Sequence, residues 1–197
     1  MSETPMNAAE LREQAQGLRL HGLLAHWSEV MADADAAQRI AQWLRWELQE
    51  RGRRSLERRL GDAHIGQFKP VADFDWSWPT QIDRAAIEEL MTLQFLADAT
   101  NVVFAGPNGV GKTMCACNLG YQAVLAGHTV LFVTAGQLLG DLAALDSDSA
   151  LRSRLRRYAA LDLLLIDEVG YLSYSNRHAD LLFELVSRRY QHKSTVV

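Results

Sequence analysis

The chain has 197 residues, of which 48% are hydrophobic, which is enough for one globular domain with a sizeable core and an appendage. Its net charge of −4 excludes a uniformly basic nucleic-acid-binding protein. No apolar run approaches the roughly 18 residues of a membrane span and no charged-then-apolar leader opens the sequence, so we expect a cytoplasmic protein without a membrane partner.

The first 60 residues are predicted to be helical after a disordered start over 1–7. Apolar residues recur at steps of three and four over 8–31, which predicts a helix that is interrupted near Gly17 or Gly22. A second helix is expected over 36–60. Gly61 is expected to end it.

Residues 61–79 have the composition of an extended linker with aromatic anchors. We expect the tryptophans of this half of the chain to be packing anchors rather than platforms for stacked bases: Trp43, Trp46, Trp76 and Trp78. Thr80 and Asp83 resemble a capping box that opens a helix through about Leu96. The predicted division is therefore a helical region over 1–60, a linker over 61–79 and a nucleotide-binding core over 80–197.

Strands and helices are predicted to alternate after residue 100. The expected strands are 102–105, 129–133, 161–166 and 194–197, and the expected helices are 111–126, 135–145, 150–160 and 179–190. Gly127 is placed to close the first of these helices. This alternation predicts an α/β fold with a parallel sheet and helices on both of its faces.

A glycine-rich turn after the first strand fits the pattern G-x-x-x-x-G-K-[ST] at every position. Glycines let the backbone N–H groups turn toward a phosphate, and the helix that follows adds the positive end of its dipole. Lys112 is expected to reach the β- and γ-phosphates, and Thr113 to coordinate Mg²⁺. The predicted ATP-binding residues are Gly106, Pro107, Asn108, Gly109, Val110, Gly111, Lys112 and Thr113.

The apolar strand over 161–166 ends in two acids, Asp167 and Glu168. In phosphate-loop enzymes an acid at the end of a neighbouring strand holds Mg²⁺, and Asp167 fits that role. Glu168 could then orient or deprotonate the attacking water, which makes it the predicted catalytic base beside Lys112. The sequence has no Asn-Lys-x-Asp segment to recognise guanine, so the pattern favours ATP over GTP.

Two groups of arginines are candidates for contacts with DNA. Arg51, Arg54 and Arg58 are spaced to share one helix face and could bind phosphates in a salt-dependent, sequence-independent way. They could equally form a solvated face that Glu47, Glu50 and Glu57 partly neutralise. Arg152 and Arg156 would lie on one side of the helix over 150–160. For these two, contact with DNA, contact with another subunit and plain solvation all stay open.

Three segments resemble IstB-like ATP-binding proteins: residues 106–113, 163–172 and 179–190. These proteins are AAA+ helpers of insertion-sequence transposases and are similar to the DnaC helicase loaders. The resemblance implies an ATP- and Mg²⁺-dependent AAA+ protein that forms homo-oligomers on DNA and recruits a transposase. A DnaC-like helicase loader and a non-catalytic module that only binds nucleotide or transposase stay open as alternatives.

Members of this family continue from a strand like the one over 194–197 into a polar sensor, a further strand and an arginine-bearing helix. The resemblance therefore implies that the C-terminal part of the usual fold is absent from these 197 residues. An arginine supplied in trans contributes about 10³–10⁵ to the rate of phosphoryl transfer. On this basis we expect the chain as given to be a poor ATPase.

Overall fold

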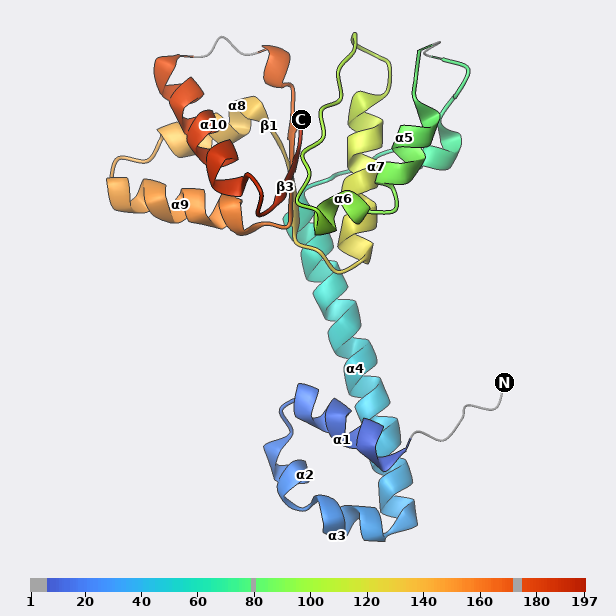
Figure 1. Ribbon diagram of the computed structural model, residues 1–197. Helices are drawn as coiled ribbons and strands as arrows, with labels where there is room; N and C mark the ends of the chain where they lie inside the picture. Colours follow the sequence, from blue (N-terminus) through green and yellow to red (C-terminus); the bar gives the residue numbers. More distant parts are fainter. Residues whose placement is uncertain (1–6, 79–80, 172–174) are drawn as a thin grey trace. The chain divides into compact units, whose positions relative to one another are not determined.

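The computed structural model describes residues 7–78, 81–171 and 175–197 (Figure 1). The chain divides into two compact units, Met1–Ser55 and Leu56–Val197, which are described separately. In the described ranges no helix has the length and apolar character needed to cross a membrane. The predicted disordered start, Thr80 of the predicted capping box and Leu172 of the family motif all lie outside the described residues.

The first unit is helical, as predicted. It contains α1 (Ala8–Gly17), α2 (His21–Ala25), α3 (Trp27–Ala32) and the part of α4 (Ala34–Ala63) that precedes the boundary. Asn7 and Glu10 form a capping box at the start of α1. The predicted interruption near Gly17 is confirmed, since α1 ends there and Arg19 has a positive φ of 58°. The core of the unit consists of Leu11, Ala15, Leu18 and Leu44.

The prediction that Gly61 ends the second helix is wrong, because α4 continues to Ala63. Leu60 and Ala63 pack into the core of the second unit, and that burial offsets the roughly 1 kcal/mol by which glycine disfavours a helix interior. The single helix expected up to Leu96 is also wrong. It is two short helices, α5 (Arg84–Leu90) and α6 (Gln94–Ala97), separated by Leu93 in a left-handed conformation.

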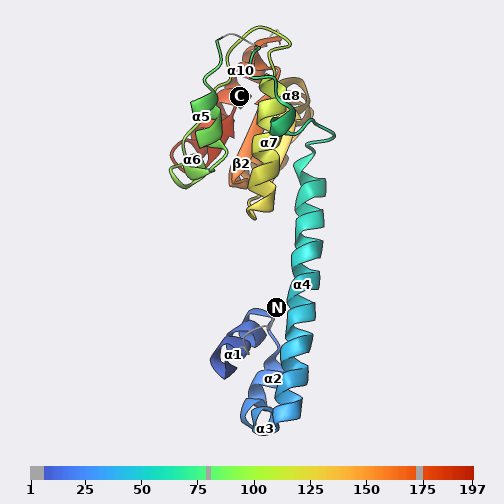
Figure 2. The ribbon, with the colours of Figure 1, turned by 90° about the vertical axis from the view of Figure 1, so that its right-hand side faces the viewer.

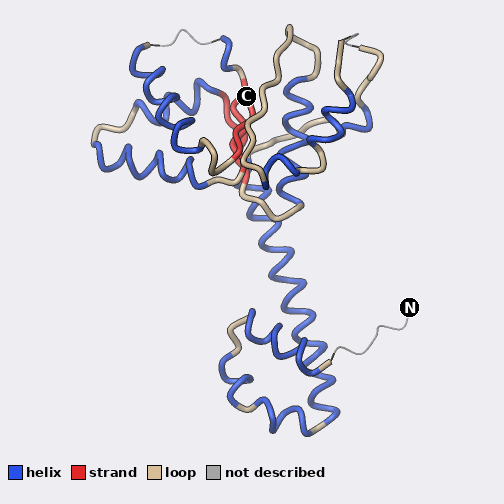
Figure 3. Tube along the Cα trace, in the orientation of Figure 1, coloured by secondary structure: helices blue, strands red, loops and turns tan. Residues whose placement is uncertain are grey.

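The second unit is built on a parallel sheet in the order β1 (Val130–Thr134), β2 (Leu163–Asp167), β3 (Ser194–Val196). Val130 lies opposite Leu163, and Leu163 lies opposite Ser194. Figure 3 shows the strands between two groups of helices. The predicted α/β fold with a parallel sheet is therefore confirmed.

Helices cover both faces of the sheet, as predicted (Figures 1 and 2). One group consists of α5, α6 and α7 (Lys112–Leu125), and the other of α8 (Ala135–Ala143), α9 (Asp148–Ala160) and α10 (Asn176–Arg189). Short 3₁₀ turns lie at Val71–Asp73 and Val169–Tyr171. Gly127, with a φ of 101°, follows α7, and the backbone N–H groups of Gly127 and His128 cap the free carbonyls of Val124 and Ala123.

Successive residues of β2 face opposite sides of the sheet, which gives the unit two cores. Leu163 and Leu165 pack with α7, whereas Leu164 and Ile166 pack with α8, α9 and α10. Gly120 of α7 lies so close to β2 that a Cβ atom there would be 2.5 Å from a Leu165 methyl group. The close approach of α7 to the sheet holds the start of this helix beside the end of β2.

The predicted strand over 102–105 is only partly present. Val102 forms an isolated parallel bridge with Val196, and the segment exchanges three backbone hydrogen bonds with β3 and Val197. Val103 is 72% exposed, and no described strand pairs with the other side of the segment. The segment is therefore held to the sheet by a single bridge and does not form a regular strand.

The expectation that the tryptophans are packing anchors is wrong for three of them. Trp43, Trp46 and Trp78 are 57%, 55% and 64% exposed. Leu44 fills the core of the first unit from a different face of α4, so that Trp43 and Trp46 face away from it. Trp76 alone of the four packs against a buried neighbour, Phe74, with ring centroids 4.7 Å apart.

Candidate functional site

The glycine-rich turn leads directly into the first turn of α7. Gly109 and Gly111 have positive φ values of 80° and 92°, a conformation that only glycine adopts without strain. A Cβ atom at Gly111 would also lie 2.5 Å from Cε2 of Phe74. Position 111 therefore requires glycine for two reasons: the backbone has a positive φ, and the Phe74 ring leaves no room for a side chain.

Phe74 belongs to the segment predicted as a linker, and its role beside the loop was not predicted. It is buried with Ile87 and Cys115 against the start of α7. Asn118 fixes the same segment to α7, because its side chain accepts a hydrogen bond from the backbone N–H of Val71 and donates one to the carbonyl of Lys69. Only the aromatic residues of the linker gave a sequence signal for this anchoring.

Lys112 curls back over the loop that precedes it. Its ammonium group donates hydrogen bonds to the carbonyl oxygens of Gly106 at 2.8 Å and Pro107 at 2.7 Å. The positive charge of Lys112 thus lies inside the ring of backbone formed by the loop. This is where the sequence places the phosphates of a nucleotide.

Thr113 and Asp167, 54 positions apart, meet at the mouth of the loop. The Thr113 hydroxyl donates a hydrogen bond of 2.8 Å to Oδ2 of Asp167. Thr113 lies in the first turn of α7 and Asp167 is the last residue of β2, so the packing of this helix on this strand brings the hydroxyl and the carboxylate together. In the described part of the chain no group of three or more His, Cys, Asp or Glu forms a metal site.

Glu168 follows β2 in a left-handed conformation, with a φ of 60°. Its backbone N–H donates to Oδ1 of Asp167 at 2.9 Å, and its side chain is exposed. A hollow of about 540 Å³ is lined by Asn108, Gly109, Gly111, Lys112, Thr113, Asp167 and Glu168. The structure therefore places the predicted lysine, hydroxyl and both acids around one open space.

The arginines of α4 are largely occupied by acids on the same helix. Arg51 donates to Glu47 at 2.6 Å, and Arg54 donates to Glu50 at 2.7 Å. Hydrogen bonds from Arg53 and Arg54 lower the pKa of Glu50 to about 2. Arg58 is exposed and makes no ion pair with another described residue.

The arginines of α9 divide by face. Arg152 and Arg156 are exposed, whereas Arg154 forms an ion pair with Asp141 of α8. Tyr158 donates to the same carboxylate at 2.6 Å. Burial opposes the ionisation of Asp141, but the hydrogen bonds from Tyr158 and Arg154 outweigh it and lower the pKa of Asp141.

Arg189 has a role that the sequence did not indicate. Its side chain is fully buried, and the guanidinium donates to the carbonyls of Tyr158, Ala159 and Leu161 at the end of α9. It also donates to Thr195 and Ser194 of β3. Burial lowers the pKa of Arg189 to about 10, and the charge of Asp162 partly offsets this effect. This side chain joins α9, α10 and β3.

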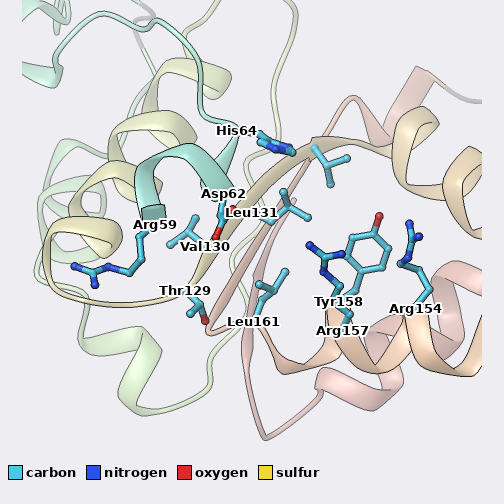
Figure 4. Close-up of a pocket in the computed structure, with 11 residues that line it drawn as sticks. Arg59, Asp62, His64, Thr129, Val130, Leu131, Arg154, Arg157, Tyr158 and Leu161 are labelled. Carbon is cyan, nitrogen blue, oxygen red and sulfur yellow. The ribbon is translucent and has the colours of Figure 1, made fainter. Parts of the chain in front are cut away.

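Figure 4 shows another hollow in the second unit, of about 420 Å³, beside the edge strand β1. Residues of α9 lie on one side of it and residues at and after the end of α4 lie on the other: Arg154, Arg157 and Tyr158, and Arg59, Asp62 and His64. None of the described residues that line it belongs to the phosphate loop.

The sequence of this chain is similar to those of known ATP-binding proteins. The profile of the family described as IstB-like ATP binding protein matches residues 13–197. An ATP-binding protein of insertion sequence IS21 from Pseudomonas aeruginosa is 36% identical over 154 residues, which cover 78% of this chain and 58% of that protein. One of insertion sequence IS5376 from Geobacillus stearothermophilus is 30% identical over 193 residues, which cover 95% of this chain and 76% of that protein.

A solved structure has the same fold. It is the replication initiator DnaA bound to AMPPCP and single-stranded DNA, with a TM-score of 0.50 and 20% sequence identity. The match covers 63% of this chain and 42% of the DnaA chain. It supports the assignment of an α/β fold.

Proposed function

Since the chain belongs to the family of IstB-like ATP-binding proteins, we propose that residues 106–113 bind the phosphates of ATP and that the chain assists the transposition of an insertion sequence. The observation that carries the nucleotide site is the hydrogen bond between Thr113 and Asp167. It brings a hydroxyl and a carboxylate, the oxygen ligands that Mg²⁺ prefers, to the open side of a glycine loop with a lysine inside it.

Each residue of the site has a separate task in this proposal. When ATP binds, the Lys112 ammonium group would give up its hydrogen bonds to the carbonyls of Gly106 and Pro107 and donate to phosphate oxygens instead. The N–H groups at the start of α7 would face the same phosphates. Thr113 and Asp167 would hold Mg²⁺, which supplies positive charge against the terminal phosphate when bound. The described residues provide too few ligands for a metal site of their own, so the nucleotide and water would complete the coordination.

Glu168 is the proposed general base. It lines the hollow beyond Asp167, and its exposed carboxylate could accept a proton from the water that attacks the terminal phosphorus. As that water adds, the bond from phosphorus to the bridging oxygen breaks and ADP leaves. The backbone N–H of Glu168 fixes one oxygen of Asp167, which would keep this carboxylate in position to hold the cation.

For DNA we propose contacts from α9 rather than mainly from α4. Arg152 and Arg156 are exposed on the same side of α9, whereas Arg51 and Arg54 are already paired with Glu47 and Glu50. Arg58 adds an exposed charge on α4. The DnaA structure, which was solved with single-stranded DNA, supports a DNA-associated role for this fold.

A transposase is the proposed partner, with the chain acting as a homo-oligomer. The names of the Pseudomonas and Geobacillus relatives support a role in insertion-sequence movement over helicase loading. A module that binds nucleotide without turnover is the alternative from another class. Steady-state ATPase measurements with and without DNA would distinguish the two.

The nucleotide site is tested by calorimetry with ATP and Mg²⁺. Lys112→Ala should weaken ATP binding by more than about tenfold, because it removes charge-assisted hydrogen bonds to phosphate. Lys193→Ala is the matched control, since Lys193 pairs with Asp162 and does not line the phosphate hollow. Equal affinity in parent and Lys112→Ala protein would contradict the assignment.

A further inference from the structure

The exposed tryptophans of α4 belong to a longer stripe of residues on the first unit, which we call the tryptophan seam. It consists of Asp35, Arg39, Trp43, Trp46, Glu50 and Arg54. These positions follow one another at steps of three or four, so at 3.6 residues per turn they fall within a stripe about 100° wide. All are exposed except Glu50, which is half-buried.

The other side of α4 in this unit is already occupied. Leu44 is 2% exposed in the core, and Ile40 packs against the same cluster. No residue of the seam is a member of that core, and Trp43 and Trp46 are each more than half exposed. Paired exposed tryptophans on one helix face are typical of an association surface.

We infer that the tryptophan seam pairs with the same seam of a second copy of this chain, with the two α4 helices antiparallel. If the two-fold axis passes between positions 44 and 45, Trp43 faces Trp46 of the second copy. In the same register Arg39 faces Glu50 of the second copy, and Asp35 faces Arg54 of the second copy. Every charged residue of the seam then meets a residue of opposite sign.

The charge pattern favours a second copy of the chain as the partner and an antiparallel arrangement of the two α4 helices. A parallel pairing would place Arg39 against Arg39 of the second copy and Glu50 against Glu50 of the second copy, and like charges in contact oppose association. Single-stranded DNA could stack on the indoles, but Asp35 and Glu50 on the same stripe would repel its phosphates.

Glu50 can take part even though Arg53 and Arg54 already bind it on the same helix. A carboxylate has about four acceptor sites, which leaves room for a guanidinium from the second copy. The area is small, since the seam is narrow and only the two tryptophans are large apolar side chains. Small interfaces are weak, so we expect a dissociation constant on the order of micromolar.

The inference does not depend on nucleotide binding, and it is tested on the full chain without nucleotide by sedimentation equilibrium. The parent should dimerise reversibly in the micromolar range. Trp43→Ala combined with Trp46→Ala should raise the dissociation constant by more than about tenfold. Trp78→Ala is the matched control, because Trp78 is as exposed but lies outside the seam, and it should leave the dimer unchanged.

Charge exchange tests the register. Arg39→Glu and Glu50→Arg should each weaken the dimer, and the double variant should recover it, with circular dichroism to check that α4 stays helical. A conservative variant covers the case in which the charge reversals disturb the helix. Arg39→Lys keeps the charge, and a carbodiimide should join the amine that this variant carries to the carboxylate of Glu50. The two positions are about 16 Å apart on one helix, too far for a zero-length link, so that product must join two copies.

A parent chain that stays monomeric would overturn the inference, as would a dimer that is indifferent to both the tryptophan and the charge variants. Absence of the cross-link between positions 39 and 50 in a dimer of Arg39→Lys protein would overturn the antiparallel register. A single-stranded oligonucleotide that quenches Trp43 and Trp46 fluorescence in a monomeric chain would assign the seam to DNA and overturn the inference as well.

Discussion

The two units of the chain differ in how much core holds them together. The first unit has a core of four buried apolar residues, with smaller contributions from partly buried neighbours. Among its described residues the second unit has two large cores, with twelve buried residues on one side of the sheet and nine on the other, and a smaller cluster around Phe74. A small core leaves little margin over conformational entropy, so we infer that the first unit depends more on association for its stability than the second.

The arginines of the two units show the same contrast. In the first unit Arg51, Arg53 and Arg54 are exposed and bind acids one turn away on the same helix, interactions that contribute little to stability. In the second unit Arg189 is buried and donates to backbone carbonyls at the end of α9, about 30 positions away, as well as to Thr195 of the nearby strand β3. Ion pairs within one helix leave the surface of that helix open to a partner, whereas the buried hydrogen bonds of Arg189 hold separate segments of the fold together.

The largest expected effect is that of Arg189→Met, which should destabilise the second unit by about 3–5 kcal/mol because it leaves several buried carbonyls unpaired. Arg188→Met is the matched control, since Arg188 pairs with Glu184 on the same helix and should cost far less. Urea unfolding followed by circular dichroism gives both values. Similar midpoints for the two variants would show that the buried contacts of Arg189 do not hold the unit together.

Leu44→Ala should cost the first unit about 2–5 kcal/mol through lost burial and a cavity in its small core. Hydrogen exchange should then show α1–α3 losing protection while β2 keeps it. Equal loss of protection in β2 would mean that the two units unfold as one block, and the comparison between them would fail.

Gly120→Ala should destabilise the second unit by about 1–3 kcal/mol, because the added methyl group meets Leu165 across the packed interface of α7 and β2. Gly140→Ala in α8 is its counterpart, since nothing lies within 4 Å of the position. That substitution should stabilise the protein by about 0.5–1 kcal/mol. Thermal unfolding distinguishes the two, and opposite signs are the expected result.

The smallest expected effect concerns the stability of the second unit at low pH. Burial alone would raise the pKa of Asp162, but Lys193 and Thr129 outweigh it and lower the pKa from 3.8 to about 2. A lowered carboxyl pKa stabilises the fold above the unfolded value, and this contribution is lost as pH falls from about 4 to about 2. Asp162→Asn should therefore flatten the stability profile of the second unit in that window. An unchanged profile would show that Asp162 does not contribute to unfolding in acid.

The sequence alone predicted the features that depend on local pattern. The spacing of Gly106, Gly111 and Lys112 located the loop, and the alternation of strands and helices located the sheet. Asp167 could be placed beside Thr113 because the carboxyl end of a neighbouring strand meets the loop in this fold. The catalytic and cation-binding roles of these residues remain predictions.

Features that depend on distant segments were not predictable in this way. The ring of Phe74 against Gly111 and the buried guanidinium of Arg189 join residues that no periodicity relates. The exposure of Trp43 was misjudged because helical spacing shows which residues share a face but not which face the core occupies. The strand before the loop was overestimated because its apolar composition does not reveal that it meets the described sheet through a single bridge.

The segment before the phosphate loop obtains its sheet contacts from residues made much later. Thr195 donates its backbone N–H to the side chain of Asn101, 94 positions away, and Val102 pairs with Val196. A ribosome that adds about 5–20 residues per second needs roughly 5–20 s to cover that distance. During this time the loop has no β3 beside it and Val102 has no partner strand. The sheet contacts of the segment before the phosphate loop can therefore form only after residues 195–197 have been made.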